Sequence, residues 1–113
     1  MSRSYDLYSG CIQIAKDIVR KSDGMAKFHG FDAEQVIKDV REAEKIYIIA
    51  KDFWIAQAAL GQAKEKVNAA RLLEVDEYPH VVALEAAQNE YDRLLAKMEE
   101  VEQVFTRKPY ITN

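Results

Sequence analysis

The sequence contains a single cysteine, two prolines and four glycines among 113 residues. One cysteine excludes an internal disulfide, and so few prolines and glycines exclude a collagen-like or low-complexity chain. No stretch approaches the roughly 20 apolar residues that a membrane-spanning helix needs, and the N-terminal residues do not lead into the apolar run of a signal peptide. We therefore expect a single domain over residues 1–113 that is soluble and cytoplasmic.

An excess of one charge is also missing, since 16 basic residues stand against 19 acidic ones and give a formal net charge of −3. Proteins that bind nucleic acid through a basic face are usually strongly basic. The balance argues against that class, and we expect no nucleic-acid partner. A mixed distribution of this kind is typical of solvated helix surfaces.

The usual motifs of catalysis and metal binding are scarce. A di-iron bundle needs two Glu-x-x-His pairs, which this sequence does not contain, and no Cys-x-x-Cys or His-x-x-x-His pair offers a zinc site. Glycine-rich phosphate loops and Gly-x-Ser-x-Gly motifs are absent. Cys11 lies among apolar residues at helical spacing, which favours a buried thiol over a nucleophile. We predict no enzymatic activity, no cofactor and no metal.

Three segments carry apolar residues at the three- and four-residue spacing of one helix face, over residues 5–21, 33–73 and 78–106. Asp32 and Gln35 have the capping-box spacing before the second segment, and Pro79 suits the first turn of the third. The sequence predicts an all-α fold. We expect a helical bundle in which a long central helix packs, in coiled-coil fashion, against an antiparallel C-terminal helix.

Residues 22–31 connect the first two segments and contain the large apolar residues Met25, Phe28 and Phe31. We expect either a short helical turn here or a loop that folds over the core as a lid. A pocket near Met25–Phe31 would make the protein a small-ligand-binding bundle or an enzyme, which is a hypothesis of a different class.

The central segment carries two apolar seams and is apolar nearly all round between Ile46 and Leu60. A helix apolar on more than one face has to be covered on more than one side, and an exposed apolar patch of that size normally marks an interface. We predict a homodimer or higher oligomer that also binds another protein. Large aromatic residues dominate such contacts. The expected interface residues are Tyr47, Phe53, Trp54 and Leu60.

A bend at Gly61 is the alternative to self-association. Such a bend would divide the central segment in two and would form a compact four-helix monomer. No proline forces a break at this point, so the sequence alone leaves both arrangements open.

The runs Pro79–Gln88 and Tyr91–Val101 resemble the last helix of the YlbF/YmcA family, where a Pro-Val start is followed by an Ala-rich turn and a Leu-Leu pair. Ala15–Ile18 followed by Ser22, and Phe53 with Gln57, are similar to the earlier helices of that family. The stretch between Gln57 and Pro79 is shorter than the usual one. The resemblance covers about half of the chain.

This resemblance implies an all-helical, self-associating regulator without catalysis of its own, of the kind that acts in bacterial complexes for competence, biofilm formation and RNA processing. Some family members bind iron–sulfur clusters through extra cysteines. That property does not carry over, because this chain has only Cys11.

The sequence therefore favours a non-enzymatic helical protein–protein interaction module, a self-associating regulator or adaptor. An alternative is an inhibitor, encoded by a phage or mobile element, that binds a host protein through the acidic outer face of the third segment. That acidic face consists of Glu85, Glu90, Asp92, Glu99, Glu100 and Glu102.

Overall fold

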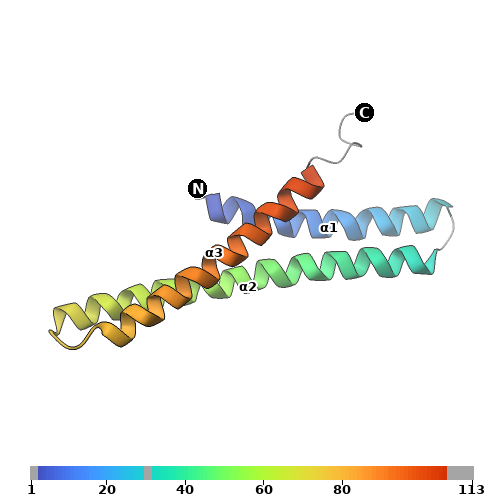
Figure 1. The fold of residues 1–113 in the computed structure, drawn as a ribbon. Coiled ribbons are helices and arrows are strands. Elements are labelled where there is room, and N and C mark those ends of the chain that lie inside the picture. The colour runs from blue at the N-terminus through green and yellow to red at the C-terminus, as the bar shows by residue number, and fades with distance from the viewer. Residues whose placement is uncertain (1–2, 30–31, 107–113) are drawn as a thin grey trace.

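The computed structural model describes residues 3–29 and 32–106, with the side chains of residues 3–24 and 32–105. Its helices are α1 (Arg3–His29), α2 (Ala33–Leu72) and α3 (Tyr78–Thr106). α1 and α2 lie side by side in opposite directions, and α3 returns along the second half of α2 before it crosses the first turns of α1 (Figure 1). The predicted all-α bundle, with its long central helix and antiparallel C-terminal helix, is confirmed.

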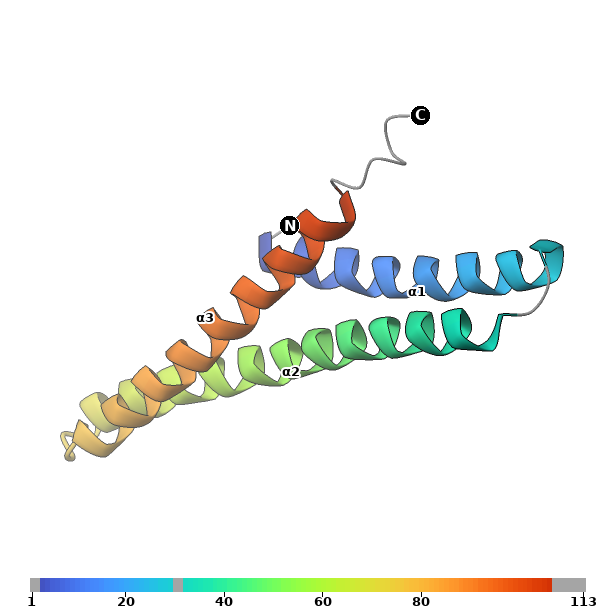
Figure 2. The ribbon, with the colours of Figure 1, turned by 45° about the vertical axis from the view of Figure 1, so that its right-hand side comes forward.

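The molecule is elongated, because the 40 residues of α2 form a rod of roughly 60 Å. Its extents are 67 × 28 × 17 Å and its radius of gyration is 19.3 Å, whereas a compact domain of this length has a radius of gyration of about 13 Å. Figure 2 shows that α3 follows α2 closely at the α2–α3 turn and diverges from it toward α1. Each side of α2 is therefore covered along only part of its length.

α2 begins where the sequence predicts, at the Asp32 cap. Asp32 has an extended backbone, and its Oδ1 accepts a hydrogen bond from the amide of Gln35 at 3.2 Å, which satisfies one of the free amides of the first turn. The side chain of Gln35 donates instead to Oδ1 of Asp39, at 2.9 Å. Only one half of the predicted capping box is therefore formed.

The turn between α2 and α3 contains a residue in an unfavourable backbone region. Glu74 has a φ of 57°, in the left-handed region where helices usually place glycine. Its amide donates to the carbonyl of Arg71 at 3.3 Å, and the amide of Val75 donates to that of Ala70 at 3.0 Å. This pair of bonds is the Schellman motif. Asp76 then accepts from the amide of Tyr78 at 3.0 Å and begins α3.

α1 is longer than the segment 5–21 predicted from the sequence, since it continues through residues 22–29. Neither a lid loop nor a separate short turn forms before His29. The buried positions Leu7, Cys11, Ala15 and Ser22 lie on one face of the helix, so packing on that face reaches Ser22, where the sequence suggests a loop. A glycine inside a helix costs only about 1 kcal/mol, which packing of this kind offsets.

α2 is continuous through Gly61. A Cβ atom added at Gly61 would meet nothing within 4 Å, so this glycine neither bends the helix nor allows a close approach. The alternative of a bend that divides α2 and yields four helices is wrong.

One row of α2 faces both neighbouring helices. Ile46, Phe53, Leu60 and Val67 recur every seven residues and are buried. In the first half of α2, a buried alanine stands three residues before each member of this row. In the second half, a buried alanine stands three residues after each member. Steps of three residues backward and forward lead to opposite sides of the row, about 60° from it. These alanines are Ala43 and Ala50, then Ala56, Ala63 and Ala70.

The two alanine sides correspond to two different partners. Ala43 lines a groove together with Val19 of α1, whereas Ala63 lines a hollow together with Ala83 and Ala87 of α3. α1 therefore covers the first half of α2 and α3 covers the second half, as Figure 1 shows.

The three helices meet around Phe53. This side chain is fully buried in one cluster with Leu7 of α1 and with Leu94 and Met98 of α3. Its ring contacts that of Tyr91 with centroids 5.1 Å apart and planes tilted by 41°. Phe53 is thus the centre of the hydrophobic core.

Candidate interaction surface

The side of α2 that faces away from this core carries large apolar residues in contact with solvent. Between 38% and 57% of each of these side chains is exposed. We refer to them as the α2 face. Its members are Ile37, Val40, Tyr47, Ile48, Trp54 and Ile55.

Helix geometry arranges the α2 face as two parallel rows. A step of seven residues is two turns less about 20°, so Val40, Tyr47 and Trp54 form one row, and Ile48 and Ile55 form the other. Ile37, eleven residues before Ile48, lies in the direction of this second row. The line between the rows carries two charged residues, Glu44 and Lys51, which are both exposed. Among the described residues, neither of these takes part in an ion pair.

The first row borders a groove of about 310 Å³ between α1 and α2. Val19 of α1, itself 42% exposed, forms one wall. The remaining lining comes from α2: Val40, Ala43, Glu44, Tyr47, Ile48 and Lys51. An apolar groove along a helix is a shape into which another helix can pack.

Trp54 is held in place although about half of it is exposed. Its ring contacts that of Tyr8 of α1, with centroids 5.0 Å apart and planes tilted by 36°, which is a favourable offset geometry for aromatic pairs. A side chain already fixed in one orientation loses less conformational entropy on binding. Trp54 is therefore suited to anchor a contact.

The structure divides the four residues predicted for an interface into two groups. Tyr47 and Trp54 lie on the α2 face, 38% and 49% exposed. Phe53 and Leu60 are only 0% and 7% exposed, since they belong to the row that α1 and α3 cover. These two side chains pack within the chain and are not accessible to a partner here.

Ile48 and Ile55 were absent from the sequence prediction, although they are the more exposed members of the face, at 52% and 57%. Their seven-residue spacing was the available signal. It was obscured because the neighbouring residues Ile46, Ile49 and Phe53 make this part of α2 apolar in every direction.

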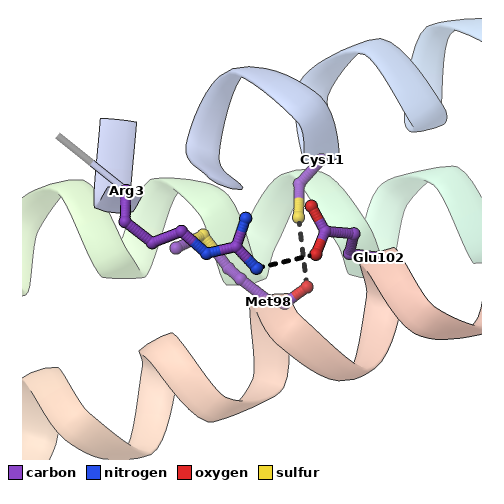
Figure 3. A network of polar contacts seen from close by, with 4 residues as sticks. All are labelled: Arg3, Cys11, Met98 and Glu102. Carbon is purple, nitrogen blue, oxygen red and sulfur yellow. Dashed lines mark hydrogen bonds and ion pairs between the residues drawn. The ribbon is translucent and has the colours of Figure 1, made fainter. Parts of the chain in front are cut away.

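The only cysteine lies where α1 and α3 cross (Figure 3). The Cys11 thiol is buried and donates to the carbonyl oxygen of Met98 at 3.7 Å. Burial, together with the charge of Glu102, raises its pKa from 9.0 to about 11. A thiol that stays protonated at neutral pH is a poor nucleophile, so this environment gives Cys11 a packing role.

Glu102 also connects α1 and α3, because its Oε1 accepts from Nη2 of Arg3 at 2.9 Å (Figure 3). The Arg3 side chain is 64% exposed and that of Glu102 is 36% exposed. Pairs in contact with water stabilise a fold by about 0–1 kcal/mol. This ion pair therefore contributes little to the stability of the crossing.

No metal-binding cluster of three or more His, Cys, Asp or Glu occurs in the part of the chain that the structure describes. Glu77 and His80 have the Glu-x-x-His spacing, but the Glu77 carboxylate binds Nε of Arg71 at 2.7 Å. Within residues 3–29 and 32–106, no helix has the length and apolar content to cross a membrane.

The pocket predicted near Met25–Phe31 lies outside the residues whose side chains the structure describes. On the acidic face of α3, Glu90 forms two hydrogen bonds with Arg93, at 2.7 and 2.8 Å, which lower the pKa of Glu90. Part of that acidic charge is therefore neutralised within α3.

Comparison with known proteins identifies no relative: no family model, curated protein or solved structure matches the chain. The resemblance to the YlbF/YmcA family remains a prediction from the sequence.

Proposed function

We propose that this chain is a non-enzymatic helical interaction module that binds other proteins, including further copies of itself, through the α2 face. The observation that carries the proposal is that six large apolar side chains of α2 share one side, on which each keeps between 38% and 57% of its surface exposed. Scattered exposed apolar residues are common, but a contiguous set is typical of interaction sites.

The chemistry of the described residues supports binding rather than catalysis. The thiol of Cys11 is buried and protonated at neutral pH, whereas the α2 face offers a fixed aromatic ring, branched aliphatic side chains and a groove. Interfaces typically combine such anchors with charges at their edge. In this proposal the protein acts in the cytoplasm as a regulator or adaptor.

The test is the mass of the protein in solution, measured by light scattering over a range of concentrations. The wild-type chain is expected to exceed the 13.0 kDa of a single copy at high micromolar concentration. Ile48→Lys and Ile55→Lys place a charge in the face, and each should shift the protein to the monomer. Both residues are more than half exposed, so their replacement should leave the helical circular dichroism spectrum unchanged.

Leu72→Lys is the matched control, because Leu72 is 84% exposed but lies at the C-terminal end of α2, away from the face. This variant should associate like the wild type. A wild-type monomer at every concentration, or an equal loss of association in the control, would contradict the proposed self-association.

A further inference from the structure

The charges in the α2 face indicate how two copies would pack. Glu44 and Lys51 lie on the line between the two apolar rows and both border the groove. They are opposite in sign and seven residues apart, about 10 Å along the helix. At that separation they cannot form an ion pair with each other, and neither forms one with another residue that the structure describes, so both charges are available to a partner.

We propose that a second copy of this chain binds with its α2 antiparallel to the first, about a two-fold axis that passes between Tyr47 and Ile48. This inference rests on the proposed function and specifies the geometry of its self-association. In this register Glu44 lies opposite Lys51 of the second copy, and Lys51 lies opposite its Glu44. A two-fold axis makes both pairs at once, because each contact in such an interface occurs twice.

A parallel arrangement would place Glu44 against Glu44 and Lys51 against Lys51. Like charges opposed within an apolar interface are repulsive. The positions of these two residues therefore favour the antiparallel dimer and act against the parallel one.

The apolar rows also fit this axis. In an antiparallel two-fold pair, a row on one flank of the helix faces the same row of the other copy. Val40 then contacts Trp54 of the second copy, Tyr47 contacts its own counterpart, and Ile48 likewise contacts Ile48. On the outer flank, the aliphatic stem of the exposed Arg41 covers Ile55 of the second copy, as long charged side chains commonly do.

The remaining helices leave room for the second copy. The row that contains Tyr47 and Trp54 borders α1, through the groove with Val19 and the ring contact with Tyr8. The two α1 helices therefore lie on the same side of the paired α2 helices. Each helix is then antiparallel to its neighbours, as in an up-and-down four-helix bundle, while α3 stays on the outside.

The area available suits a dimer of modest affinity. Six side chains that are each about half exposed leave roughly 500 Å² of apolar surface per copy, or about 1,000 Å² for a pair, which is close to the lower limit for specific interfaces. Interfaces near this limit are typical of weak or transient association.

Charge reversal tests the register. Glu44→Lys and Lys51→Glu each turn two attractions into two repulsions and should raise the dimer dissociation constant by about tenfold or more at low salt. The double variant Glu44→Lys/Lys51→Glu restores both pairs with the charges exchanged and should dimerise like the wild type. Glu42→Lys, an exposed change on the opposite side of α2, is the control and should have no effect.

Disulfide trapping tests the direction of the helices independently. A mixture of Glu44→Cys and Lys51→Cys chains should form a covalent dimer, because these positions face each other across the antiparallel interface. Glu44→Cys alone should not, since its two copies are separated by about 10 Å along the axis.

The possible results separate the two proposals. Covalent dimers of Glu44→Cys alone, or a dimer that Ile48→Lys disrupts but that charge reversal leaves unchanged, would overturn the antiparallel register while the α2 face remained the interface. A wild-type chain that is monomeric throughout would overturn the proposed self-association and the register together.

Discussion

Cys11 shows how a reactive residue becomes a packing group through its position alone. Its thiol points from α1 to the backbone of α3 and donates to the carbonyl of Met98. Ionisation would place a negative charge in a buried site near the carboxylate of Glu102, and the pKa of the thiol is raised to about 11 for that reason. At neutral pH the side chain therefore acts as a small, neutral group at the crossing of two helices.

We expect Cys11 to make the free energy of unfolding depend on pH in the alkaline range. In the unfolded chain the thiol loses its proton near pH 9.0, and in the folded chain only near pH 11. Its contribution is therefore fully present below pH 9 and is lost as the pH rises through 11, by about 2–3 kcal/mol in total.

The measurement is the free energy of unfolding of the wild type minus that of Cys11→Ala, from urea titrations between pH 7 and 11. The tyrosines and lysines are common to both proteins, so their titration cancels. The difference should be constant up to about pH 8.5. Above that pH it should fall, because the wild type loses stability relative to the variant. A difference that stays flat to pH 11 would mean that the folded thiol titrates normally.

At the scale of helices, the first residues of α2 and α3 are determined locally, whereas the residues that α2 exposes are not. Asp32 and Pro79 are signals that act within one turn, and both boundaries are where the sequence predicts them. The end of α1 could not be read in this way, because Ser22 and Gly24 are a loop signal in the sequence, whereas in the structure Ser22 is buried within the helix.

The exposed face of α2 could likewise be predicted only in part from the sequence. Phe53 and Trp54 are adjacent aromatics that the sequence cannot rank, yet one is 0% and the other 49% exposed. A rotation of about 100° along the helix separates them. Which side is covered depends on where α1 and α3 pack, and that is decided by contacts between helices rather than within α2.

The end of α2 offers a test of backbone strain. Glu74 adopts a left-handed φ of 57°, which costs a non-glycine residue about 1–2 kcal/mol. Glu74→Gly should therefore stabilise the fold by about 0.5–1 kcal/mol after the greater entropy of glycine in the unfolded chain is counted. Thermal and urea unfolding would measure the change.

Glu65→Gly is the matched control, since Glu65 is exposed in the interior of α2. There the same substitution should destabilise by about 1 kcal/mol. Loss of stability in both variants would show that Glu74 contributes something that its backbone conformation does not reveal.

For the whole molecule, the elongated shape makes stability depend strongly on the one region where all three helices are in contact. α1 and α3 each cover only part of α2 (Figure 1), and all three meet around Phe53. Removing a large aromatic side chain from a packed core costs about 3–5 kcal/mol. Phe53→Ala should lower the free energy of unfolding by that amount and should loosen all three helices together.

Circular dichroism and the fluorescence of Trp54, the single tryptophan, should then report coincident transitions in the variant. The measurement is made at low protein concentration to keep self-association from contributing. Ile55→Ala, also on α2 but 57% exposed, should change stability by no more than about 0.5 kcal/mol. Separate transitions for the helix signal and for Trp54 would indicate two independent units.

The shared row of α2 also restricts how this chain can change in length. Ile46 and Phe53 pack beside alanines on one side, and Leu60 and Val67 beside alanines on the other. Inserting or deleting one residue between these halves rotates the second half by about 100° and turns its apolar row away from α3. Whole heptads preserve the phase to within about 20°. In α2, insertions and deletions are therefore compatible with this fold chiefly when they come close to a whole number of helical turns, as with roughly 7, 11 or 18 residues.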